Sequence, residues 1–152
     1  MNAFAHMMHT LAAVVWVGGM FFAYVALRPS AAQVLEPPQR LKLWAQVFAR
    51  FFTWVWSAIV LLPVTGFWMV FNNFQDFGQL GLHVHAMTLI GVVMILIFLY
   101  VYFVPYLQLR LAVIGEEWPK AGKQLTRIRW AVLINLLLGL GVVAIGSGGQ
   151  YW

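Results

Sequence analysis

Four long apolar runs, separated by short polar connections, restrict this chain to a small set of folds. The runs cover roughly residues 4–27, 48–71, 82–106 and 125–147. Each is long enough to cross the ~30 Å hydrocarbon core of a bilayer as a helix, which takes about 20 residues. None shows the period-two alternation of a barrel strand, and backbone groups in lipid must pair within their own segment. The sequence therefore predicts an all-α integral membrane protein, a four-transmembrane-helix bundle that forms one domain over residues 1–152.

The composition supports a membrane protein and excludes several functional classes. Hydrophobic residues make up 63% of the chain and charged residues 9%, a balance that no water-soluble domain of this length needs to fill its core. The absence of cysteine removes disulfides, thiolate metal sites and thiol catalysis. The formal net charge is +5, but the basic residues are confined to a few connecting segments, so nucleic acid is not expected as a partner.

The basic residues predict the direction of the helices. All nine Lys and Arg residues fall around the first and third connections, whereas the second connection and both termini contain none. Under the positive-inside rule the two basic connections are cytoplasmic, so both termini face the periplasm of a bacterial inner membrane. A cleaved signal peptide fits the first run poorly, because Arg28 follows that run instead of preceding it. The basic residues are Arg28, Arg40, Lys42 and Arg50 in the first group and Arg110, Lys120, Lys123, Arg127 and Arg129 in the second.

The first basic connection contains an amphipathic stretch. Pro37 and Pro38 are expected to interrupt the helix. The residues that follow, as far as Arg50, combine basic side chains with the aromatic side chains of Trp44 and Phe48. This pattern predicts a short interfacial helix between the first two spans. Its aromatic side chains are expected to face lipid or the bundle, and its basic side chains to face lipid phosphates.

All four histidines of the chain lie in the first turns of the first and third spans, and the predicted topology places them in one leaflet. His6 and His9 are three residues apart and share a helix face. His83 and His85 are two apart, so they cannot both point at one central site. At ~1.5 Å per residue, His9 and His85 lie within one helical turn of each other in depth. Intramembrane ionisable residues are functional candidates, so these histidines are predicted to form a ligand site, the alternative being interfacial polar residues without a ligand.

Two cofactors remain open for this site, because neutral imidazole ligates both haem iron and copper. Haem b needs axial imidazole and small residues beside the macrocycle, and Gly66, Gly141 and Gly146 occur at matching depth. The basic residues lie on the opposite side of the membrane, so they cannot complement haem propionates here. Copper is the alternative, because thioethers beside imidazole select Cu(I). The methionines considered for it are Met7, Met8 and Met87, with Met20 deeper in the span.

Other catalytic arrangements are missing from the sequence. No carboxylate lies inside a span, so no carboxylate proton relay is available, and there is no phosphate-binding glycine-rich loop and no HExxH motif. Asn135 stands alone as a polar side chain in the fourth span, where it is expected to make a hydrogen bond between helices, the alternative being a substrate ligand.

Two motifs resemble known membrane families. The first is His9-Thr10-Leu11-Ala12-Ala13-Val14-Val15-Trp16-Val17-Gly18-Gly19-Met20, ending in Leu27-Arg28-Pro29, which resembles the first span of the CopD (copper resistance D) family of inner-membrane proteins and of the haem-containing HemJ type. The second is Leu82-His83-Val84-His85, which resembles the His-x-Lys of the third HemJ span. The resemblance implies that His9 and His83 match the family's histidines. His85 stands where HemJ has lysine, which argues against protoporphyrinogen oxidation.

Three functional hypotheses follow from the residues and the resemblance. The first is a membrane cytochrome-like protein with haem b held by His9 and either His83 or His85, acting in electron transfer or in oxidation of a quinol or porphyrinogen. The second is a copper-binding protein of periplasmic copper uptake or resistance. The third is a structural subunit or assembly factor. The lipid bilayer is the expected partner, and quinone, porphyrin, a redox partner protein and a homo-oligomer stay open. The candidate copper ligands are His9, His83, His85, His6, Met7 and Met8.

Overall fold

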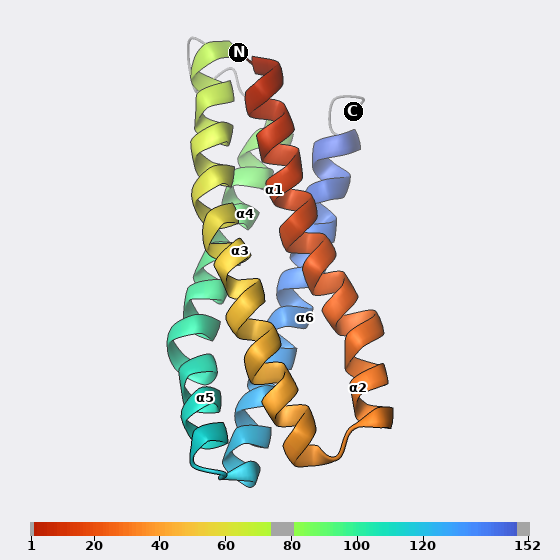
Figure 1. Ribbon diagram of the computed structural model, residues 1–152. Coiled ribbons are helices and arrows are strands. Elements are labelled where there is room, and N and C mark those ends of the chain that lie inside the picture. Colours follow the sequence, from red (N-terminus) through yellow and green to blue (C-terminus); the bar gives the residue numbers. More distant parts are fainter. Residues whose placement is uncertain (1, 74–80, 149–152) are drawn as a thin grey trace.

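The computed structural model describes residues 2–73 and 81–148, which form helices joined by short turns, with no strand in these two ranges (Figure 1). Four helical stretches are long and apolar enough to cross a membrane. The all-α, four-helix prediction is therefore confirmed, and the chain is a multi-pass membrane protein. The candidate spans are Ala3–Val34, Pro37–Asn72, Leu82–Ile114 and Trp118–Gly148.

The helices are continuous and longer than the apolar runs suggest. The helix after the first connection has 37 residues, about 55 Å at ~1.5 Å per residue, well beyond the ~30 Å of hydrocarbon. The first and third long helices each contain one π-helical turn. In chain order the elements are α1 (Asn2–Phe22), η1 (Ala23–Leu27), α2 (Arg28–Val34), α3 (Pro37–Asn73), α4 (Leu82–Val101), η3 (Tyr102–Tyr106), α5 (Leu107–Ile114) and α6 (Trp118–Gly148).

A proline lies in or beside each of the two π-helical turns. Pro29 follows η1 closely, and Pro105 lies inside η3. A proline ring lacks the N–H group for the helical hydrogen bond and collides with the carbonyl group four residues earlier. A wider turn relieves this collision while the helix continues, as is usual for π-bulges. Each helix therefore passes its proline without breaking.

The four long helices form a bundle with two distinct ends (Figure 1). The first residues of α1 and α4 and the last residues of α3 and α6 lie at one end, which we call the histidine end. The α2–α3 and α5–α6 connections lie at the other, the basic end. The most extensive helix contacts join α1 with α3 and α4 with α6, while α1 also touches α6. The long helix that begins with α4 consequently lies diagonally across the bundle from α1.

The core is aromatic and lies in the middle and basic parts of the bundle. Phe52 of α3 is its centre, with ring centroids 5.4 Å from Phe98 and 4.9 Å from Tyr106, both edge-on. Phe48 stacks on Phe52 at 5.3 Å. Each such pair contributes about 0.5–1.5 kcal/mol beyond the burial of area. Between Trp16 and the histidine end, the buried side chains among the described residues are small or short. This end is therefore packed less densely than the core.

The predicted interfacial helix does not exist as a separate element. The residues after Pro37 are instead the first turns of α3, which runs without interruption to Asn73. Leu41, Trp44 and Phe48 are spaced three or four residues apart and are at most 5% exposed, because they pack against the other helices. Of the two environments predicted for Trp44 and Phe48, lipid or the bundle, the structure shows the bundle.

Candidate metal site at the histidine end

His9 of α1 is held against α3 by a hydrogen bond. Its Nδ1 lies 2.9 Å from Oγ1 of Thr65, which is only 8% exposed. A threonine hydroxyl has one proton, and Thr65 donates it to the carbonyl oxygen of Leu61. Oγ1 must therefore accept from His9, which places the imidazole proton on Nδ1. The other ring nitrogen, Nε2, then carries the lone pair that ligates a metal ion.

A glycine of α3 lies beside this ring. A Cβ atom added to Gly66 would lie 3.5 Å from Cε1 of His9, so a single methyl group at this position would be in ordinary van der Waals contact with the imidazole. A larger side chain at this position would push the ring away from Thr65. The sequence suggested Gly66 as a small residue beside a haem macrocycle, and in the structure its side-chain neighbour is the ring of His9.

The other α1 candidates are less enclosed than His9. His6 is exposed, Met7 is 48% exposed and Met8 is half-buried. The backbone oxygen of His6 accepts a hydrogen bond of 2.9 Å from the hydroxyl group of Thr10, one turn later in the same helix. Of these three side chains, Met8 is the one that is shielded to a similar degree as His9.

The α4 candidates divide into one partly buried and one exposed histidine. His83 is half-buried, with its ring against Gly81, whereas His85 is exposed. Met87 lies over α6, where its Cε would be 3.0 Å from a Cβ added to Gly146. A Cβ atom added to Gly141 would have no neighbouring atom within 4 Å, so this glycine borders open space and not a packed slot.

The structure does not gather the four histidines into one metal-binding group. Within residues 2–73 and 81–148, no three His, Asp or Glu side chains are placed to share a metal ion. The reason is the topology: α1 packs on α3 and α4 packs on α6, so His9 and His85 belong to opposite corners of the bundle. Equal depth along the membrane normal, on which the sequence argument relied, does not make helices neighbours. His9 and its Thr65 support remain the best-defined element of the candidate site.

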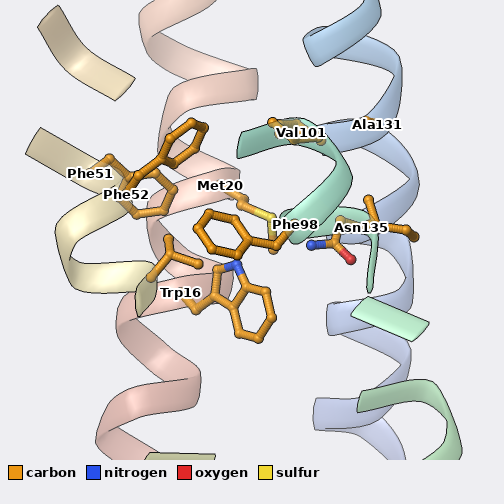
Figure 2. A pocket seen from close by; sticks show the side chains of 11 residues that line it. Trp16, Met20, Phe51, Phe52, Phe98, Val101, Ala131 and Asn135 are labelled. Carbon is orange, nitrogen blue, oxygen red and sulfur yellow. The ribbon is translucent and has the colours of Figure 1, made fainter. Parts of the chain in front are cut away.

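A small pocket in the middle of the bundle is lined by the polar side chain of Asn135 (Figure 2). Asn135 of α6 is 4% exposed, and its side-chain oxygen has no hydrogen-bond partner, although a bond between helices was expected. The pocket measures about 20 Å³, which is enough for one water molecule. Met20 also lines it, together with Trp16 and Phe98, and therefore belongs to the middle of the bundle and not to the histidine end.

Removing the hydroxyl of Thr65 is expected to weaken metal binding without unfolding the bundle. In Thr65→Val the shape is kept, but Nδ1 of His9 loses its acceptor, so the ring can rotate and change tautomer. Loss of such a supporting hydrogen bond typically costs about 10- to 100-fold in metal affinity. Thr65→Ser keeps the hydroxyl and is the matched control. Equal copper affinities for the two variants, measured by competition with a chromophoric Cu(I) chelator, would contradict the role assigned to Thr65.

The fold defines a four-helix, multi-pass membrane protein. The family model of copper resistance protein D (CopD) matches residues 45–148, more than half of the chain, and the chain therefore belongs to the CopD family. The match covers most of α3 and all of α4 to α6, while α1 with His6 and His9 precedes it. Neither the curated proteins nor the solved structures yielded a match. The likeness to HemJ-type proteins stays an expectation from the sequence.

Proposed function

We propose that this CopD-family protein binds copper as its cargo at the histidine end of the bundle, in periplasmic copper uptake or resistance. The observation that carries the proposal is the Leu61–Thr65–His9 hydrogen-bond chain, which leaves the lone pair of Nε2 for a metal ion. Imidazole combined with thioether suits Cu(I). Met8 is the nearest thioether in sequence and is half-buried like His9, while His6, one turn earlier, can supply a second imidazole.

The charge distribution favours a cation at this end. Within the described residues, no Lys or Arg lies at the histidine end, that is, in the first turns of α1 and α4 or the last turns of α3 and α6. A metal ion approaching His9 therefore meets no Lys or Arg side chain close by, and repulsion from the distant basic side chains is screened beyond ~10 Å at 0.1 M salt. The positive-inside rule puts this end in the periplasm of a bacterial inner membrane, where copper would arrive from outside.

Haem b is the second candidate, because the glycine beneath His9 leaves an apolar face beside an imidazole ligand. This arrangement supports one axial ligand. The second would have to come from His83 or His85 on the diagonal helix, and His85 is exposed. Electron transfer, or oxidation of a quinol or porphyrinogen, would follow from haem binding. The donor set fits copper better, since copper needs no second helix.

The two candidates are separated by metal titration and the visible spectrum of the same sample. The full chain, purified in neutral detergent, is expected to be colourless and to bind Cu(I) from a chelator competition under anaerobic, reducing conditions. A sample that shows a Soret band and takes up no Cu(I) would replace the copper proposal with haem b. A sample that contains neither haem nor a copper site would leave a structural or assembly role.

A further inference from the structure

A second pocket lies at the basic end of the bundle, whereas His9 lies at the histidine end. It has a volume of about 430 Å³, a size typical of ligand sites. Its walls come from three helices that are far apart in the sequence: the η1–α2 segment, the first turns of α3, and α6. The residues that line it are Tyr24, Arg28, Pro29, Ala32, Arg40 and Arg129.

Three guanidinium groups therefore share this pocket without a counter-charge. Arg28, Arg40 and Arg129 line it, and within the described residues the one ion pair is between Lys120 and Glu117, outside the pocket. The Nε of Arg129 is buried and has no hydrogen-bond partner. Like charges repel at close range, and a buried guanidinium donor without an acceptor costs free energy. An anion in the pocket would remove both penalties.

An aromatic ring, and not an acidic residue, holds the guanidinium group of Arg28. The charged end of Arg28 lies 4.9 Å from the ring centroid of Tyr24, a cation–π contact that keeps it at the pocket wall. Arg40 stands in the first turns of α3, and Arg129 in the basic half of α6. Arginine's planar fork matches the oxygens of a phosphate, to which it donates two parallel hydrogen bonds.

We propose that this pocket binds the phosphate headgroup of an anionic phospholipid. Counted along their helices at ~1.5 Å per residue, Arg129 lies about 28 Å from Gly148, Arg28 about 39 Å from Asn2 and Arg40 about 50 Å from Asn73, the last residue of the long α3 helix. A hydrocarbon core of ~30 Å that starts near the histidine end therefore ends close to this pocket, in the headgroup layer. Basic pockets between transmembrane helices are known binding sites for anionic headgroups.

The surface above the pocket suits the acyl chains of such a lipid. Phe22 and Val25 lie within two turns of Pro29 on the same long helix and are 61% and 52% exposed. They offer apolar surface on the membrane side of the charged pocket. A soluble phosphate compound would share the headgroup chemistry but would make no use of this surface, and this difference separates the two sources by experiment.

The test compares the thermal stability of the full chain in neutral detergent with three added probes: dioctanoyl phosphatidylglycerol, dioctanoyl phosphatidylcholine and inorganic phosphate. Phosphatidylglycerol is expected to raise the Tm by several degrees, and the other two probes to leave it nearly unchanged, because a ligand of the folded state stabilises it by mass action. Arg129→Gln is expected to lose most of this rise. Arg127→Gln removes the same charge from an exposed position two residues away and is expected to keep it.

The outcomes decide the proposal in either direction. An equal loss in Arg127→Gln and Arg129→Gln would mean that phosphatidylglycerol responds to net charge alone, which overturns the pocket. An equal rise with inorganic phosphate would overturn the lipid headgroup in favour of a soluble anion. Without any anion, Arg129→Gln is expected to have a Tm no lower than the wild type, since it relieves repulsion among the three arginines. If Arg129→Gln does not fold, Arg40→Gln replaces it in the same comparison.

Discussion

His9→Ala is expected to lower the affinity of the protein for Cu(I) by about 100-fold or more. Loss of a supporting hydrogen bond alone costs about 10- to 100-fold in metal affinity, and this substitution removes the proposed ligand itself. The helix should be retained, because His9 is only half-buried and alanine has the highest helix propensity. The measurement is the dissociation constant for Cu(I), determined by competition with a chromophoric chelator on detergent-purified protein.

His85→Ala is the matched comparison for His9→Ala. It removes the same side chain at the same end of the bundle, but from an exposed position on α4. We expect its effect on the Cu(I) affinity to be at least about tenfold smaller, because among residues 2–73 and 81–148 no hydrogen bond joins its ring to another helix. If both substitutions weaken binding equally, the copper ligands must come from both α1 and α4, and the proposed site at the α1–α3 contact is incorrect.

Ile128→Ala is expected to lower the free energy of unfolding by about 2–5 kcal/mol, the usual cost of deleting a fully buried aliphatic side chain. Ile128 of α6 is 0% exposed and belongs to the core that joins this helix to the rest of the bundle. The cost has two parts, the lost transfer free energy of the methyl and methylene groups and the cavity that a stiff aromatic core cannot close. Unfolding of the protein in mixed micelles by added dodecyl sulfate measures it.

Ile134→Ala on the same helix provides the control for this stability measurement. Ile134 is 49% exposed on the outer surface of the bundle, so its deletion leaves no cavity. We expect it to destabilise the protein by less than half as much as Ile128→Ala. A similar loss for both variants would show that the apparent core does not carry the stability of the bundle, and that surface contacts or helix propensity dominate.

The distribution of packing has a consequence for function. The aromatic core around Phe52 stiffens the middle and basic parts of the bundle, whereas the histidine end has mostly small buried residues such as Ala5 and Ala12. The proposed copper site therefore lies outside the main core, in the less densely packed part of the bundle.

Much of the fold follows from local properties of the sequence. Four apolar stretches, each without a carboxylate, predict four spanning helices, and the structure contains them. The ends of these helices could not be predicted in the same way. Arg40 and Lys42 predict where hydrocarbon stops. Leu41 and Trp44 are nevertheless buried against protein, and the helix continues through all four residues, so charge does not predict the end of the helix.

The candidate site shows where local reasoning stops. The sequence alone singled out the histidines and methionines as candidates and predicted their depth, because position along a helix converts into depth in a bilayer. It could not show that His9 bonds to Thr65, a residue 56 positions away, or that α4 occupies the opposite corner of the bundle. Depth is a one-dimensional property of each helix, whereas neighbourhood depends on how four helices pack side by side. That packing singled out one imidazole from four and brought three arginines of distant segments to one pocket.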